Sequence, residues 1–127
     1  MKEIIKTKYA AAPIGPYNQA VLINGFLYTS GQIAIDPETG ETQFDSIDIE
    51  THRVMKSLEA ILKAAKMDFN HVIKASIFIS NMDDFSKINH IYGSYFNEET
   101  APARETIQVA KLPKNANVEI SFIAYNK

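Results

Sequence analysis

Residues 19–30 read QAVLINGFLYTS, two apolar segments joined by Asn24-Gly25. Both residues of such a pair tolerate positive φ, which a tight turn between antiparallel strands requires. The stretch therefore predicts a β-hairpin with strands over 19–23 and 26–30. A second turn is predicted over 36–40, DPETG, because proline fixes φ and glycine closes the reversal.

Beyond these turns the apolar period changes to that of a helix, starting near Ile49. One stripe contains Val54, Leu58, Ile61, Leu62 and Ala65. Asp48 is the expected N-cap, and Lys63 and Lys66 suit the negative end of the helix dipole.

The second half of the chain predicts a strand, a helix and two more strands. The strand spans 72–80, and the side chains expected on its helix-facing side are Ile73, Ala75, Ile77 and Ile79. Asn81 or Asp83 is expected to cap the second helix, which Ala101-Pro102 ends. Its apolar stripe contains Phe85, Ile88, Tyr92, Tyr95 and Phe96. The last strands are predicted over 104–110 and 118–125.

This order, β-β-α-β-α-β-β, predicts a single α+β domain over residues 1–127, with two helices on one face of a mixed sheet. Apolar residues also occupy the other side of the strands. Val72 and Phe78 oppose the helix-facing set, and Ile123 and Tyr125 oppose Val118, Ile120 and Phe122. Because two helices cover only one face, another subunit is expected to cover the second.

Charge and composition argue against several classes of protein. The 13 basic residues are scattered among 15 acidic ones, the net charge is −2, and the densest basic cluster is Lys111 with Lys114. A nucleic-acid partner is therefore not expected. Cysteine is absent, no apolar run approaches the ~20 residues that cross a bilayer, and residues 1–5 do not resemble a signal peptide. We expect a cytoplasmic protein without a membrane partner.

Common catalytic motifs are also missing. His52, His71 and His90 have no acidic or histidine partner three or four residues further on, so no metal site is predicted. Ser30 lacks the Gly-x-Ser-x-Gly context of a serine nucleophile. Neither a phosphate loop nor a dinucleotide fingerprint is present. The sequence therefore predicts chemistry without a cofactor.

Several segments together closely resemble the RidA family, also called the YjgF family. They are IGPY (14–17), YTSGQI (28–33), NMDDF (81–85), IN (88–89), PAR (102–104), VAKLPK (109–114) and VEI (118–120). The resemblance covers essentially the whole chain, in order. It implies a chorismate-mutase-like α+β fold, a homotrimer with active sites between subunits, and cofactor-free hydrolysis of 2-imino acids or their enamines to 2-oxo acids and ammonia.

The resemblance also assigns two catalytic residues. Arg104 matches the family's carboxylate-binding arginine, and a planar guanidinium suits that ligand. Its alternative is a surface arginine paired with Glu98, Glu99 or Glu105. Glu119 matches the glutamate thought to position the attacking water. Its alternative is a solvated carboxylate on a strand edge.

Further substrate-binding residues follow from the same resemblance: Tyr17, Ser30, Gly31, Asn89 and Thr106. Tyr17 is alternatively a half-buried aromatic residue, Gly31 a strand bulge and Asn89 a local cap. Thr106 stands where many members carry cysteine, and Glu105 where many carry serine. Strand alternation places Thr106 on the same face as Arg104 and turns Glu105 away.

Two other functions remain open beside the 2-iminobutanoate/2-iminopropanoate deaminase. One is an endoribonuclease or translation inhibitor, a role also ascribed to members of the family. The other is a non-catalytic trimer that senses a small carboxylate metabolite or holds partner proteins. Arg104 suits a sensor and an enzyme equally, so only Glu119 favours the enzyme.

Overall fold

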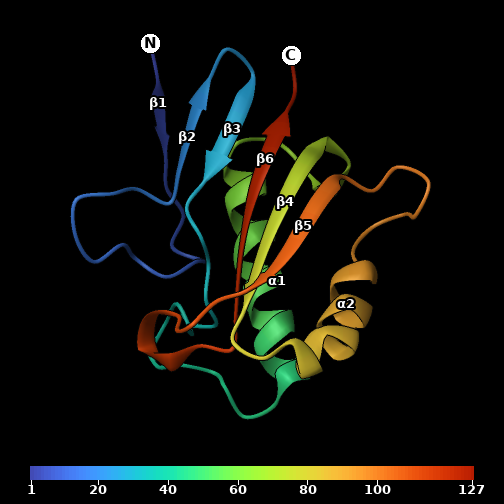
Figure 1. Ribbon diagram of the computed structural model, residues 1–127. Coiled ribbons are helices and arrows are strands. Elements are labelled where there is room, and N and C mark those ends of the chain that lie inside the picture. The colour runs from blue at the N-terminus through green and yellow to red at the C-terminus, as the bar shows by residue number, and fades with distance from the viewer.

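The computed structural model describes residues 1–127, and Figure 1 shows one six-stranded sheet in front of two α-helices. The strands are β1 (Glu3–Ile5), β2 (Ala20–Ile23), β3 (Phe26–Thr29), β4 (Val72–Ile79), β5 (Ala103–Gln108) and β6 (Val118–Tyr125). The helices are α1 (Ile47–Ala64) and α2 (Phe85–Gly93), with short 3-10 turns η1 (Phe69–His71), η2 (Met82–Asp84) and η3 (Pro113–Asn115). The spatial order is β1-β2-β3-β6-β4-β5, and only β4 and β5 are parallel. The predicted α+β fold is confirmed.

Both predicted turns are present. Asn24 and Gly25 have φ values of 50° and 84° and join β2 to β3, as the positive-φ argument requires. In the second turn the Gly40 N–H donates to the Asp36 carbonyl at 2.8 Å, and Gly40 has a φ of 77°.

One strand was not predicted. β1 pairs antiparallel with β2, with Ile4 opposite Val21. Three residues are too few to show alternation, and only pairing with β2 defines the strand.

Both helices begin or end differently from the prediction. Ser46, not Asp48, caps α1, because its Oγ accepts from the Ile49 N–H at 3.1 Å. α2 ends at Gly93, well before Ala101-Pro102. Asn81 caps the η2 turn that leads into α2, and Asp83 donates its N–H to that cap at 2.9 Å.

The predicted alternation fails at the start of β4. A β-bulge shifts the register between Val72 and Lys74, so Val72 is buried while Ile73 is 47% exposed. Ile73 was expected beside Ala75 on the helix-facing side, and the bulge turns it away. Alternation is regular from Ala75 onward.

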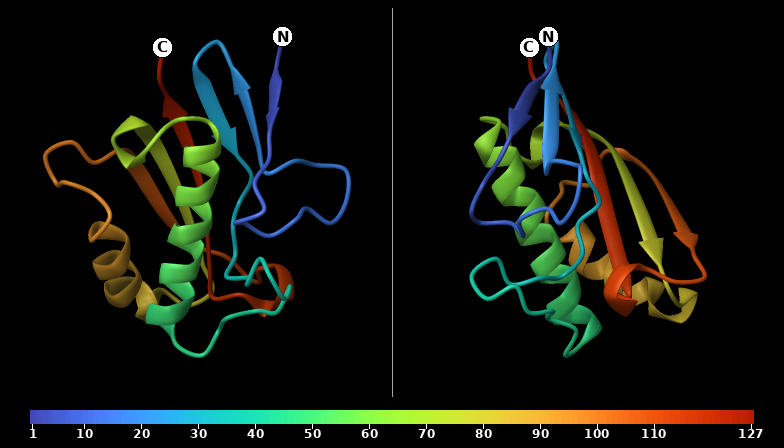
Figure 2. Two further views of the ribbon diagram at one scale, coloured as in Figure 1. Left: turned by 180° about the vertical axis from the view of Figure 1, so that it is seen from behind. Right: turned by 90° about the vertical axis from the view of Figure 1, so that its left-hand side faces the viewer.

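The core lies between the sheet and the helices, which form two layers in Figure 2. The α1 stripe of Val54, Leu58, Ile61 and Leu62 is fully buried there. The other sheet face, which we call the open face, carries Tyr28, Phe78, Ile107, Ile123 and Tyr125. Three of these, Tyr28, Ile107 and Tyr125, are between 37% and 46% exposed. No helix of the structure is long and apolar enough to span a membrane.

Candidate functional site

The two predicted catalytic residues lie on opposite faces of the sheet. Arg104 is in register with Ala75, whose side chain is buried against the helices, so Arg104 belongs to the helix side. Glu119 is in register with Phe78 and alternates with the buried Val118 and Ile120, so it belongs to the open face. Within one subunit the two side chains therefore do not face a common ligand.

Arg104 lies at the start of β5 beside α2, on the wall of a hollow of about 500 Å³ that also includes Asn89 and Tyr92. We call it the Arg104 hollow. The Nη1 atom of Arg104 donates to Asn89 Oδ1 at 2.6 Å. The guanidinium carbon of Arg104 lies 5.2 Å from the Tyr92 ring centre and 5.7 Å from that of Phe85. Arg104 is exposed, but its nitrogens form no ion pair within 4.0 Å, so the pairing with Glu98, Glu99 or Glu105 in the alternative is wrong.

Tyr92 was predicted only as a core residue, yet it contributes to this hollow. Burial raises its pKa to about 12, although the positive charge of Arg104 acts in the opposite direction. Its hydroxyl is buried and has no hydrogen-bond partner. The sequence does carry a signal for this role, because Tyr92 follows Asn89 by three residues and both side chains therefore lie on the same face of α2.

Glu119 lies on the wall of a second hollow, of about 250 Å³, which we call the Glu119 hollow. Tyr17, Gly31, Gln32 and Lys114 also line it. The carboxylate is half-buried, and this burial raises the pKa of Glu119 above its ordinary value. A carboxylate with a raised pKa is a better proton acceptor near neutral pH than an ordinary one.

The loop before β2 brings Tyr17 to the Glu119 hollow. Gln19 is buried and fixes this loop, because its Oε1 accepts from the Thr7 N–H at 2.7 Å and its Nε2 donates to the Ala11 carbonyl at 2.9 Å. Ser30 Oγ donates to the Asn18 carbonyl at 2.6 Å. Ser30 therefore anchors the loop and does not line the hollow itself.

The histidines have local partners. His52 Nδ1 is 2.8 Å from the Tyr95 hydroxyl, and His71 completes a capping box with Asp68 in η1. No group of three or more histidine, aspartate or glutamate side chains is placed to hold a metal ion.

Comparisons with known proteins identify the family of this chain. A family model described as Endoribonuclease L-PSP matches residues 7–126. The chain belongs to this family, the RidA family. It is 42% identical to the mouse 2-iminobutanoate/2-iminopropanoate deaminase over 124 residues, 98% of this chain and 91% of the mouse protein.

Other RidA relatives carry different names. A Lactococcus lactis protein named as a regulator, AldR, is 50% identical and covers 96% of both chains. The solved structure of E. coli TdcF with bound serine has a TM-score of 0.92 and 37% identity, over 98% of this chain and 99% of that one. The family and fold that the sequence resemblance implied are confirmed.

The orientations predicted for Glu105 and Thr106 are also confirmed. Glu105 points to the open face, where it accepts from Ser76 Oγ and pairs with Lys74 Nζ at 3.0 Å. These contacts lower the pKa of Glu105 below its usual range, and the hydrogen bond from Ser76 has the largest effect. Thr106 is in register with Ile77 and shares the Arg104 side, but it does not line the Arg104 hollow, and its Oγ1 is buried without a partner.

One buried carboxylate that supports the site was not predicted. Glu50 of α1 is fully buried and accepts from the backbone N–H and side-chain Nδ2 of Asn117, both at 2.7 Å. It also accepts from the Val118 N–H at 3.3 Å. These bonds fix the first residue of β6, next to Glu119.

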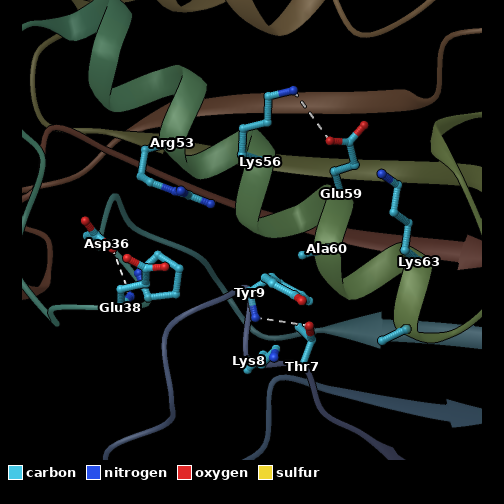
Figure 3. A pocket seen from close by; sticks show the side chains of 12 residues that line it. Thr7, Lys8, Tyr9, Asp36, Glu38, Arg53, Lys56, Glu59, Ala60 and Lys63 are labelled. Carbon is cyan, nitrogen blue, oxygen red and sulfur yellow. Dashed lines mark hydrogen bonds and ion pairs between the residues drawn. The ribbon is translucent and has the colours of Figure 1, made fainter.

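A third hollow, of about 1000 Å³, is larger than these two and includes none of the predicted site residues. Figure 3 shows it between α1 and the loop that carries Tyr9. Its wall combines Arg53, Lys56 and Lys63 with acidic residues, and Lys56 already pairs with Glu59 at 3.6 Å. Because both basic and acidic side chains line this hollow, it favours neither anionic nor cationic ligands.

Proposed function

We propose that this protein hydrolyses small 2-imino acids, or their enamine tautomers, to 2-oxo acids and ammonia, as a cytoplasmic homotrimer with active sites between subunits. The mouse and bovine relatives, each 42% identical, are named 2-iminobutanoate/2-iminopropanoate deaminase, and this supports the reaction. The Arabidopsis relative, also 42% identical, is named Reactive Intermediate Deaminase A.

The observation that carries the proposal is the separation of Arg104 and Glu119 onto opposite faces of one sheet. Each has its own hollow: the Arg104 hollow does not include Glu119, and the Glu119 hollow does not include Arg104. The open face also carries the exposed apolar side chains of Tyr28, Ile107 and Tyr125. Packing this face against other copies would bury it and would bring the Glu119 hollow of one copy to the Arg104 hollow of the next.

The proposed chemistry needs few groups. Arg104 binds the substrate carboxylate through its guanidinium N–H groups. Glu119 orients a water molecule and accepts one of its protons as the oxygen attacks the carbon of the protonated imine. Glu119 then returns this proton to the nitrogen of the tetrahedral intermediate. As the carbon–nitrogen bond breaks and ammonia leaves, Glu119 takes the proton of the new hydroxyl, whose oxygen becomes the carbonyl of the 2-oxo acid. Neither a cofactor nor a covalent enzyme intermediate is required.

The remaining predicted residues have supporting roles in this proposal. Tyr17 and Gly31 line the water side, together with the loop that Ser30 anchors. Asn89 and Thr106 belong to the carboxylate side, Asn89 through its bond to Arg104. Thr106 replaces the cysteine of many relatives, so any chemistry of that thiol is absent here.

A non-catalytic sensor is the second candidate, because the AldR relative is named as a regulator and TdcF has been solved with bound serine. Such a protein would use Arg104 in the same way but would not need Glu119 as a proton acceptor.

The deciding experiment generates iminopropionate with an amino-acid oxidase and follows loss of the imine with and without the protein. Calorimetry with pyruvate measures binding separately. Arg104→Lys replaces the two-pronged guanidinium by a point charge and should weaken both binding and turnover, and Arg104→Ala should nearly abolish both. If the parent binds pyruvate but never accelerates hydrolysis, the sensor function is correct. RNA cleavage by purified protein, with imine hydrolysis unaffected in Arg104→Ala, would instead favour the ribonuclease.

A further inference from the structure

The guanidinium of Arg104 contacts only uncharged side chains. Asn89 Oδ1 accepts from Nη1 at 2.6 Å, and the rings of Tyr92 and Phe85 lie 5.2 and 5.7 Å from the guanidinium carbon. A cation within about 6 Å of a ring centre is attracted by the negative face of that ring. No carboxylate lies within 4.0 Å of the Arg104 nitrogens, so its charge is not neutralised by the protein.

All three neutral partners come from one face of α2. Phe85, Asn89 and Tyr92 are spaced by four and three residues, which places them one above another along the helix. Tyr92 is 4% exposed and packs its ring 4.9 Å from that of Phe96, so its own position is fixed by the core. A rigid ring beneath a flexible arginine restricts the directions in which the guanidinium can lie.

The hydrogen bonds of the guanidinium leave most of its donors free. A guanidinium offers five N–H donors, and the only hydrogen bond that the Arg104 guanidinium makes in the structure is the one to Asn89. This bond fixes the rotation of the planar group while the remaining edge stays available for a two-pronged contact with a carboxylate.

We propose that Tyr92 and Asn89, with Phe85, are positioning residues that orient Arg104 as a carboxylate receptor without neutralising it. This rests on the proposed function, since it assigns the carboxylate of the substrate to Arg104. The ring of Tyr92 carries the effect. Its hydroxyl, buried without a partner, does not contribute.

The test compares pyruvate affinity by calorimetry, and KM and kcat for iminopropionate, across matched variants. Tyr92→Phe keeps the ring and should remain within about twofold of the parent in every constant. Tyr92→Leu removes the ring and should weaken pyruvate binding about fivefold or more, with KM raised more than kcat is lowered. Phe69→Leu removes an aromatic side chain from the same cluster without touching Arg104, so it controls for general loosening of the core and should leave affinity unchanged.

Asn89→Asp provides a variant that does not depend on core packing. The new carboxylate would pair with Arg104 and compete with the substrate, so pyruvate affinity should fall about tenfold or more while the melting temperature stays the same or rises. Unchanged affinity in both Tyr92→Leu and Asn89→Asp, combined with lost affinity in Arg104→Ala, would overturn the positioning roles and leave the proposed function intact. If Arg104→Ala retains its affinity for pyruvate, both the positioning roles and the proposed function are wrong. Equal losses in Tyr92→Leu and Phe69→Leu would show that the ring of Tyr92 acts only through packing.

Discussion

The side chain of Glu119 lies across Gly31 so closely that a Cβ on Gly31 would stand 2.5 Å from Glu119 Oε2, 2.7 Å from Cδ and 3.0 Å from Cγ. A Cβ atom does not approach other atoms this closely without a bond, so the absence of a side chain at residue 31 is a condition for the observed position of the carboxylate. Gly31 thereby sets where the proposed proton acceptor lies within its hollow.

Gly31→Ala should therefore displace the Glu119 carboxylate. The clash falls on a movable side chain, so the melting temperature should change by no more than about 3 °C, whereas imine hydrolysis should fall about tenfold, equivalent to about 1.4 kcal/mol in the activation free energy. Steady-state kinetics and thermal melts on the same preparation check both parts. Unchanged hydrolysis would mean that the carboxylate tolerates the shift or takes no part in the reaction.

Glu119→Gln should separate catalysis from binding. The amide is nearly isosteric but accepts no proton, so hydrolysis should fall by roughly 10²-fold or more while pyruvate still binds. In the parent, kcat/KM should rise with pH through the raised pKa of Glu119, above the ordinary value of about 4.3 for glutamate. A pH–rate profile of the parent locates this rise in kcat/KM. If the same rise persists in Glu119→Gln, another titrating group causes it.

The same carboxyl predicts a pH-dependent stability difference. Its pKa is raised by burial in the folded state, so the associated stabilisation is present below the unfolded pKa and is lost as pH rises through the folded pKa. Glu119→Gln cannot ionise and should melt at a higher temperature than the parent at pH 7–8. This gain should shrink to nothing below about pH 4. Thermal melts across this range measure it, and a gain independent of pH would point to a packing effect.

Glu50 should be required for stability and not for chemistry. Glu50→Ala leaves the Asn117 and Val118 donors without a partner in the core, and it should lower the free energy of unfolding by about 3 kcal/mol or more. Glu50→Gln should cost only about 1 kcal/mol, because its carbonyl still accepts and the Asn117 amide can turn to receive the new NH2 group. Chemical denaturation measures both, and equal losses would show that the negative charge itself is needed.

The open face should mediate assembly. Tyr28 is 46% exposed on this face, and Tyr28→Glu would place a charge where the proposed trimer buries apolar surface. We expect dissociation in light scattering, with loss of imine hydrolysis. Ile49→Glu changes a residue of similar exposure, 49%, on α1 and should leave both properties intact. A parent protein that is monomeric at micromolar concentration would remove the inter-subunit site.

Much of the fold follows from local sequence patterns. The hairpin at Asn24-Gly25 depends on positive φ at two adjacent residues, and the α1 stripe and the alternation of β6 depend on spacings of a few residues. The opposite orientations of Glu105 and Thr106 follow from the same alternation. The resemblance to RidA proteins added residue roles that such patterns do not contain.

Other features arise only when distant segments meet. The β-bulge that exposes Ile73 depends on pairing with β6, and the bond from Asn117 to Glu50 spans 67 residues. The Glu119–Gly31 contact and the contacts of Arg104 with α2 also join residues from separate segments of the chain. Periodicity within a segment determines which face a side chain occupies, because backbone geometry fixes the repeat. It does not determine which distant residue lies opposite, since that depends on how the sheet and helices pack together.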